Sequence, residues 1–300
     1  MSKLLPYFKL IRLPAGFTAL SNILAASIIV SNGQISSGIV YLLGASVSLY
    51  FAGMTLNDCF DFKEDLRERP QRPIPSKQVS LKKAWSIGAI LLCLGVCLSL
   101  LHSAVSAGIA IVLSILIILY NSVFKKGLLG SFCMASCRYL NWLLGASFPL
   151  AAYSFSEDIW QLNFLIALPI FFYIAGLTFL SKQETTAQNK QAIGVCAGLL
   201  LLSVATCCYL VEQYFQLTCA KQLISYGLIA LCALIMARKL IAVFNDFTPS
   251  NIQRLIGFMV MGVIPLDALL TALAGHYLYS MLILALLLPS RLVGKRLYVT

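Results

Sequence analysis

Long apolar stretches separated by short polar ones run through the whole chain. A helix needs about 20 apolar residues to cross the hydrocarbon core of a bilayer. We predict transmembrane helices near residues 14–31, 38–56, 84–101, 104–122, 130–152, 161–180, 192–212, 221–243, 252–273 and 276–291. The last two could instead form one crossing and a re-entrant piece. The first has no small-residue cleavage site, so we expect the protein to keep it. The pattern predicts a polytopic all-α bundle of nine to ten transmembrane helices, with residues 1–300 in one domain.

The composition is typical of a membrane protein, and the distribution of charge predicts which ends of the helices share a membrane face. Hydrophobic residues make up 60% of the chain and charged residues 11%, against about 25% charged in ordinary soluble domains. The formal net charge is +11, and in so apolar a chain this excess indicates membrane topology rather than nucleic-acid binding. Alternating the crossings puts every basic residue except Arg138 and Lys221 on one face. We expect that face to be cytosolic in a bacterial inner membrane or stromal in a plastid membrane.

A cluster of acidic residues follows the second apolar stretch. Five of the eleven acids lie between Asp58 and Glu68. If the helix continues, Asn57, Asp61 and Asp65 lie one turn apart on one face, with Asp58 beside them. Carboxylates gathered in this way need a cation, and ligands that are all oxygen favour a hard ion such as Mg²⁺.

Basic residues follow this cluster at once. Arginine and lysine side chains bind phosphate oxygens well, and those nearest are Arg67, Arg69, Arg72 and Lys77. Metal-binding acids and phosphate-binding bases beside a membrane interior indicate a site for a lipid diphosphate. The alternative is a solvated charged loop whose basic members only set the topology.

These residues resemble a known family. Asn57 to Asp65 matches the NDxxDxxxD motif of the UbiA superfamily of intramembrane prenyltransferases, and Arg69 to Ser76, RPQRPIPS, is similar to the stretch that follows it there. Arg12 to Gly16 resembles the start of the family's first helix. Tyr120-Asn121 with Lys125-Lys126 resembles its loop after the fourth helix. The resemblance covers at least residues 12–190.

The resemblance implies a helical bundle around a central cavity. It also implies Mg²⁺-dependent transfer of a prenyl group from a prenyl diphosphate to an acceptor, often aromatic, at the bilayer. Asn57, Asp61 and Asp65 would bind the metal and the diphosphate, with Asp61, Asp65 and Lys182 catalytic. The other expected substrate contacts are Arg12, Asp58, Arg72, Tyr120, Lys125 and Lys182.

The family's second acidic motif, in the loop after the sixth helix, is reduced here. Residues 178–185 contain no aspartate, and Glu184 is their only carboxylate. Lys182 could supply part of the charge of a missing second metal. Two functions therefore stay open: a prenyltransferase, or a UbiA-like protein that binds or transports a lipidic or small metabolite without prenyl transfer.

A short internal similarity links the two loops. Residues 52–56, AGMTL, resemble residues 175–179, AGLTF, and each segment ends just before a polar loop on the basic face. Continuing the register aligns Asp61 with Glu184, which we therefore include among the substrate-binding residues. A parallel internal repeat explains the similarity, although coincidence between two small-residue helix ends would also do so.

Polar residues inside the predicted spans suggest further contacts. Arg138 lies about two turns into the fifth span, where a charge is costly and functional by default. It could contact the substrate phosphate or the acceptor, or pair with Asp267 in the ninth span. An allylic cation could be stabilised by aromatic faces, and those nearest the acidic cluster are Tyr50, Phe51 and Phe60. Tryptophans often anchor helix ends at the membrane interface, which is our interpretation of Trp85, Trp142 and Trp160.

Overall fold

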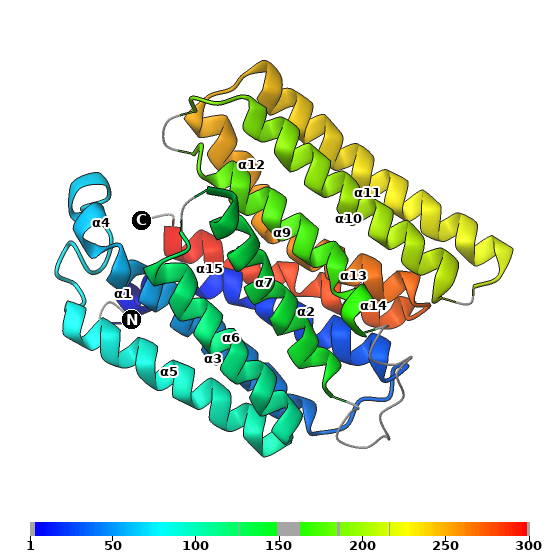
Figure 1. Cartoon of the computed structure of the whole chain (residues 1–300), viewed down its shortest axis with the longest axis horizontal. Coiled ribbons are helices and arrows are strands. Elements are labelled where there is room, and N and C mark those ends of the chain that lie inside the picture. The colour runs from blue at the N-terminus through cyan, green and yellow to red at the C-terminus, as the bar shows by residue number, and fades with distance from the viewer. Residues whose placement is uncertain (1–3, 126, 149–162, 185–186, 216, 299–300) are drawn as a thin grey trace.

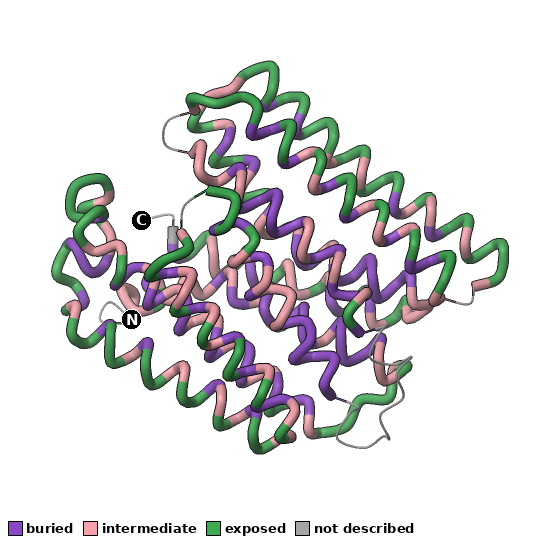
Figure 2. The backbone as a smooth tube through the Cα atoms, in the orientation of Figure 1, coloured by how far each residue is buried: buried purple, intermediate pink, exposed green. Residues whose placement is uncertain are grey.

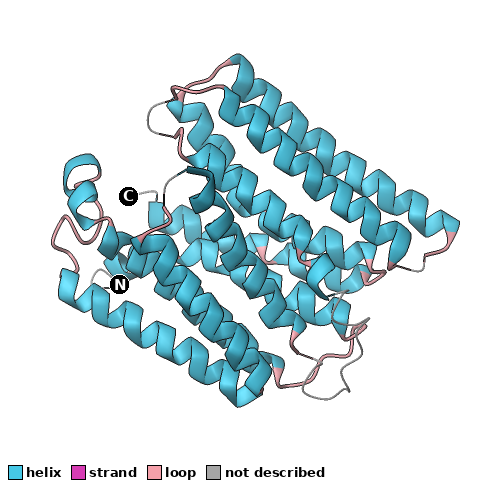
Figure 3. Ribbon diagram, in the orientation of Figure 1, coloured by secondary structure: helices cyan, strands magenta, loops and turns pink. Residues whose placement is uncertain are grey.

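The computed structural model describes residues 4–125, 127–148, 163–184, 187–215 and 217–298. These residues form helices joined by turns and loops, with no strand among them (Figure 3). Nine of the described helical segments are long and apolar enough to cross a membrane. The all-α, multi-pass membrane architecture predicted from the sequence is therefore confirmed. Trp160 lies outside the described residues, as do Lys126 and the predicted end of the fifth span.

The nine segments follow the predicted spans closely. Six are the single helices α2 (Leu13–Val30), α3 (Ile39–Phe60), α5 (Leu81–His102), α6 (Ala104–Ser122), α10 (Gln191–Gln213) and α11 (Cys219–Asn245). The other three are Asn163–Ser181, which contains α9 (Leu168–Ser181), and two interrupted segments. These are α12 (Pro249–Met261) with α13 (Val263–Leu273), and α14 (Tyr277–Ala285) with α15 (Leu287–Tyr298).

Three further helices complete the described chain. Short helices α1 (Leu5–Leu10) and α4 (Phe62–Glu68) flank α2 and α3. Helix α7 (Gly127–Ala146) is long enough to cross a membrane, but it is not among the nine apolar segments. It contains Arg138 and Asn141, and it packs against α2, α6 and α9. Counting α7 gives the upper limit of the predicted nine to ten crossings.

The helices are arranged around a buried centre. In Figure 1, α5 and α6 lie on one side and α10 and α11 on the other, with α2, α3, α7, α9 and α13 between them. Figure 2 shows the buried backbone concentrated in these central helices. The outer helices instead expose large apolar side chains, such as Leu101, Leu201 and Leu223. Such a surface suits contact with lipid.

Close packing between α3 and α5 fixes the helix that carries the acidic motif. A Cβ atom at Gly88 would lie 2.7 Å from Leu56 Cδ2, and one at Gly95 would lie 2.7 Å from Leu49 Cδ2. Small residues allow helix backbones to approach closely in membrane proteins. The two glycines thus hold α5 against the second half of α3.

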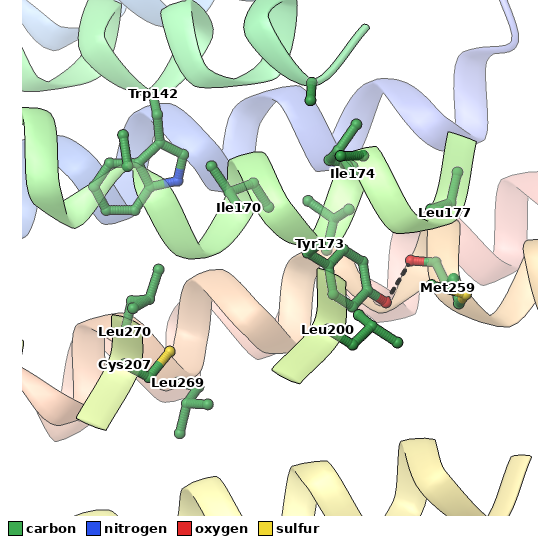
Figure 4. Close-up of a cluster of buried hydrophobic side chains, with 14 of the residues drawn as sticks. Trp142, Ile170, Tyr173, Ile174, Leu177, Leu200, Cys207, Met259, Leu269 and Leu270 are labelled. Carbon is green, nitrogen blue, oxygen red and sulfur yellow. Dashed lines mark hydrogen bonds between the residues drawn. The ribbon is translucent and has the colours of Figure 1, made fainter. Parts of the chain in front are cut away.

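The break between α12 and α13 results from packing against α9. Tyr173 on α9 donates a hydrogen bond to the Met259 carbonyl at 2.8 Å (Figure 4). Its hydroxyl lies too close to the position that a Cβ atom of residue 262 would take, which favours Gly262 there. Pro265 also lacks the N–H that would continue the helical ladder. The predicted single helix over 252–273 is therefore two shorter ones.

Candidate active site

A cavity of about 710 Å³ opens between α2, α3, α6, α7, α9, α12 and α15. Its walls are mostly apolar and include Leu49, Met54, Leu113, Ile174 and Val260. Polar groups lie near the helix ends and along one wall: Arg12, Asn57, Tyr120, Asn121, Arg138, Asn141 and Glu184. The cavity can therefore hold an apolar chain with a polar group at its end.

The acidic motif spans the junction of α3 and α4. Helical hydrogen bonds continue across it, from Asp61 N to Asn57 O at 3.0 Å and from Asp65 N to Asp61 O at 2.9 Å. Asn57, Asp61 and Asp65 thus follow one another a turn apart, as expected. Their side chains, however, separate into two groups.

The first group joins Asn57 and Asp61 with Lys125. Asn57 Nδ2 donates to Asp61 Oδ2 at 3.1 Å. Lys125, in the loop before α7, forms an ion pair with Asp61 Oδ1. Asn57 also lines the cavity. This group therefore places an amide, a carboxylate and an amine together beside the cavity.

The second group joins Asp58 and Asp65 through arginines. Arg72 Nη1 lies 2.7 Å from Asp65 Oδ2 and 3.4 Å from Asp58 Oδ1. Arg12 Nη2 lies 3.3 Å from the same Asp58 oxygen. Asp65 is almost completely buried and shares Arg72 with Asp58 instead of joining Asn57 and Asp61. Pairing with Arg72 thus sets the direction of this side chain, which the helical spacing alone does not reveal.

Arg12 reaches the site from a strained turn. Its backbone φ is +51°, in the left-handed region between α1 and α2. This conformation costs a residue with a side chain about 1–2 kcal/mol. The side chain lines the cavity as well as pairing with Asp58. The turn thus directs a guanidinium group from the start of α2 toward the acidic motif.

The loop after α9 approaches the motif through one ion pair. Arg69 Nη2 lies 3.0 Å from Glu184 Oε1, and Gln253 Nε2 on α12 donates to the Glu184 carbonyl at 3.2 Å. The ion pair places the loops after α3 and α9 on the same face of the bundle, as the predicted topology requires. Glu184 also lines the cavity.

Lys182 points elsewhere. Its amine donates to the Gly127 carbonyl and to Ser131 Oγ at 3.0 Å, and desolvation lowers its pKa. These contacts join Lys182 to the first turn of α7. The geometry thus favours a role in positioning the Lys125 loop over the catalytic role expected from the sequence.

Arg138 lies on the cavity wall in the middle of α7. It donates from Nη1 to Asn22 Oδ1 at 3.2 Å and from Nη2 to Thr18 Oγ1 at 2.8 Å. Its guanidinium carbon lies 5.1 Å from the centre of the Tyr50 ring. Asn22 Nδ2 in turn donates to Asp267 Oδ2 at 2.7 Å. Arg138 and Asp267 are therefore bridged by Asn22, and the described residues include no direct ion pair between them.

Asp267 is also the partner of Trp142. Trp142 Nε1 donates to Asp267 Oδ1 at 2.9 Å, and Ser21 Oγ donates to Oδ2 at 2.6 Å. Trp142 is completely buried and lies in the apolar cluster of Figure 4. The prediction that it anchors a helix end at the interface is wrong. Its burial in the bundle allows its N–H to satisfy a buried carboxylate.

The three aromatic residues named from the sequence have different positions. Tyr50 lines the cavity. Phe51 packs against Gly16, where a Cβ atom would lie 2.7 Å from Phe51 Cε1. Phe60 is exposed, and its ring centre lies 4.9 Å from that of Trp85. Of the three, Tyr50 is therefore the best placed to face a substrate.

Sequence reasoning missed the polar stripe of α2. Thr18, Ser21 and Asn22 are fully buried and hold Arg138 and Asp267. Their spacing of three and four residues on an otherwise apolar helix is a recognisable signal. Their partners lie more than 100 residues away along the chain, so the pairing itself is not visible in the sequence.

The comparison with known proteins agrees with this fold. The sequence model of the UbiA prenyltransferase family matches residues 19–262. The chain belongs to the UbiA prenyltransferase family.

Its relatives include proteins named digeranylgeranylglyceryl phosphate synthase. The chain is 30% identical over 193 residues to the digeranylgeranylglyceryl phosphate synthase of Methanosarcina mazei, covering 59% of this chain and 62% of the relative. It is 29% identical over 182 residues to the enzyme of that name from Sulfurisphaera tokodaii, covering 59% and 63%. These alignments thus span less than two thirds of either relative.

Solved structures share the fold. A UbiA homologue from Aeropyrum pernix aligns with a TM-score of 0.68 at 15% identity, over 84% of this chain and 97% of that one. A homologue from Archaeoglobus fulgidus bound to GPP and Mg²⁺ aligns with a TM-score of 0.62 at 15% identity, over 93% and 99%.

Proposed function

We propose that the protein transfers a prenyl group from a prenyl diphosphate to an acceptor within the membrane. The observation that carries this proposal is the position of Asn57 and Arg12, which join the acidic motif to the end of a long apolar cavity. The Archaeoglobus fulgidus homologue with GPP and Mg²⁺ supports the same substrate class. A diphosphate would lie at the motif, and its isoprenoid chain would occupy the apolar space.

The donor set of the first group suits Mg²⁺. Asn57 and Asp61 offer oxygen atoms, and their side chains already touch at 3.1 Å. Asp65, one turn further, would complete the set, although it pairs with Arg72 here. Mg²⁺ bound by these residues would neutralise charge on the leaving diphosphate. Mg²⁺ commonly takes one or two carboxylates together with substrate phosphates and water.

Basic residues around the motif would bind the diphosphate. Arg12, Arg72 and Lys125 now neutralise Asp58, Asp61 and Asp65. Because each is already near the motif, a phosphate group can share these cations without large movements of the chain. Donors fixed in advance stabilise a developing negative charge more effectively than groups that must reorient.

The cavity wall would protect the allylic cation and orient the acceptor. Apolar side chains such as Leu49 and Ile174 exclude water, and the Tyr50 ring, which already lies against the Arg138 guanidinium, lines the same space. Arg138 uses two of its donors on α2, so its remaining donors can bind the polar end of the acceptor. Tyr120, whose hydroxyl-bearing side chain lines the cavity, would contact the substrate near the motif.

The relatives suggest the kind of acceptor. Two of them are named for making digeranylgeranylglyceryl phosphate, a product that retains a phosphate. We propose an acceptor that, likewise, has a nucleophilic oxygen and an anionic group. An electron-rich aromatic carbon is the other acceptor class to be tested.

Turnover by the purified protein tests the proposal. Radiolabelled geranylgeranyl diphosphate, Mg²⁺ and a panel of lipid-phosphate and aromatic acceptors should give diphosphate release and a prenylated product. Asp61→Asn should lower this rate at least about 100-fold, whereas Asp246→Asn, in a loop away from the cavity, should leave it unchanged. Unchanged turnover in Asp61→Asn would overturn the mechanism.

The reduced second motif supports a different function as an alternative. Glu184, its one carboxylate, is neutralised by Arg69, which leaves the protein's retained acidic groups on α3 and α4. Accumulation of an unmodified compound in vesicles, without diphosphate release, would establish binding or transport instead of prenyl transfer.

A further inference from the structure

One side of α15 faces the cavity, and this side is basic. The cavity-lining residues of the helix are Ser290, Arg291, Gly294 and Lys295. Their spacing of one, four and five residues defines a single helical face. Leu288 and Leu292 of the same helix are mostly exposed. The helix thus presents two cations to the cavity.

Contacts with the first turn of α2 hold this face in place. Ser290 Oγ donates to the Pro14 carbonyl at 2.8 Å. A Cβ atom at Gly294 would lie 3.7 Å from Pro14 Cβ. Arg291 and Lys295 are therefore fixed near the start of α2, although their own side chains are exposed.

The charge of this pair is not balanced by a carboxylate. In the part of the chain that the structure describes, the ion pairs use Arg12, Arg69, Arg72 and Lys125. Asp267 is the one acid between residues 249 and 298. It is fully buried and accepts hydrogen bonds from Ser21, Asn22 and Trp142. Within the described residues, therefore, neither of these two cavity-lining cations has a carboxylate as an ion-pair partner.

Helix α2 gives the depth of this pair relative to the rest of the site. Pro14 lies beside Ser290 of α15. Thr18, which binds Arg138, lies four residues further along α2. A rise of 1.5 Å per residue separates these levels by about 6 Å along the axis. Arg12, which pairs with Asp58, lies two residues in the other direction. The acidic motif, the α15 pair and Arg138 therefore follow one another along a single helix.

We infer that Arg291 and Lys295 bind the phosphate of a phosphorylated lipid acceptor, whose reacting end extends toward Arg138. This inference rests on the proposed function and states that the acceptor of that reaction carries a phosphomonoester group. An arginine fork and a lysine ammonium four residues away suit a dianionic phosphate. The Pro14 and Thr18 levels of α2 are about 6 Å apart, a length comparable to the few bonds between the phosphate and hydroxyl groups of a glycerol unit. The diphosphate remains at the motif, on the α3 side of α2.

Lipid binding tests the pair directly. The full chain in phosphatidylcholine nanodiscs is titrated with phosphatidic acid and, separately, with diacylglycerol of the same acyl chains. The wild type should bind phosphatidic acid at least about tenfold more tightly. The double variant Arg291→Gln, Lys295→Gln should lose that preference. Arg296→Gln removes a neighbouring cation of α15 that does not line the cavity, and it should retain the preference within about twofold.

Two further arms separate the possible sources of the effect. Inorganic phosphate should compete only weakly with phosphatidic acid, because it lacks the chain that enters the cavity. If it competed as well as phosphatidic acid itself, Arg291 and Lys295 would form a site for free phosphate, and the inference would be overturned. The charge-retaining variant Arg291→Lys, Lys295→Arg should recover most of the preference, which excludes misfolding as the cause of its loss. If Arg296→Gln lost the preference for phosphatidic acid to the same extent, the preference would come from the general surface charge of α15, and the inference would be overturned.

The failure of this inference can be told from the failure of the proposed function. Asp61→Asn should lower prenyl transfer at least about 100-fold and keep the preference for phosphatidic acid. The α15 double variant should lose the preference and still bind geranylgeranyl diphosphate with Mg²⁺. If the wild type shows the preference without any turnover, the anion site stands and the prenyltransferase proposal fails.

Discussion

Arg72 Nη1 lies 2.7 Å from Asp65 Oδ2, and the same nitrogen lies 3.4 Å from Asp58 Oδ1. One guanidinium group thus ties the loop after α4 to both ends of the acidic motif. Because Asp65 is almost completely buried, its charge depends on this arginine.

Replacing Arg72 should therefore affect stability as well as activity. Arg72→Gln leaves two buried carboxylates with less compensation and should cost about 1.5–3 kcal/mol, the range for a hydrogen bond to a charged group. Thermal unfolding in detergent measures the loss. Arg67→Gln, at an exposed position on α4, is the matched control. Equal unfolding temperatures for the two variants would show that the Asp65 pairing contributes little.

Gly130 should be essential for the position of Lys125. A Cβ atom at residue 130 would lie 2.6 Å from the Phe124 carbonyl oxygen and 2.7 Å from the Lys125 carbonyl carbon. Gly130→Ala must therefore shift the loop that brings Lys125 to Asp61. We expect a KM for prenyl diphosphate raised about tenfold. Gly108→Ala, where nothing lies within 4 Å of the added atom, should leave it unchanged. A normal KM in Gly130→Ala would mean that Lys125 does not bind the substrate.

The Trp142 hydrogen bond to Asp267 should stabilise the bundle. Trp142→Phe retains most of the apolar volume and removes the donor, which should cost about 1 kcal/mol, in the range of interhelical hydrogen bonds in membranes. Unfolding in mixed detergent micelles measures the change. The comparison is Trp85→Phe, near the surface beside Phe60. A smaller loss in Trp142→Phe than in Trp85→Phe would argue against this role.

His276 should make stability depend on pH at the opposite face of the bundle. Desolvation lowers its pKa below the ordinary 6.5, so the folded protein favours the neutral ring and the unfolded chain takes up a proton first. Stability should therefore fall as the pH decreases below 6.5 toward the lower folded pKa, and then level off. Unfolding temperatures at pH 7.5 and 5 in the wild type and His276→Gln test this. The variant should lose less stability on acidification, and an identical loss would assign the effect to other groups.

The apolar pattern could predict the helices because each span is a local property of the chain. It could also predict the acidic motif, whose residues are close in sequence. It could not predict which side chains pair: Trp142 and Asp267 are 125 residues apart, and Arg138 and Thr18 are 120 apart. From the sequence, Arg291 and Lys295 indicate only which membrane face is basic. Their position beside the cavity is visible only once α15 is placed in the structure. The internal repeat and the metal ligands remain predictions.

The polarity of α7 has a consequence for how the chain is assembled. A segment with an arginine and an asparagine at its centre partitions poorly into lipid when it is released alone. The α2 groups that satisfy Arg138 are synthesised more than 100 residues earlier, so they are available when α7 leaves the translocon. We therefore expect α2 to stay beside the translocon until α7, the fifth crossing, arrives. Replacing the polar residues of α2 that bind Arg138 should then cause errors in topology before it causes errors in catalysis.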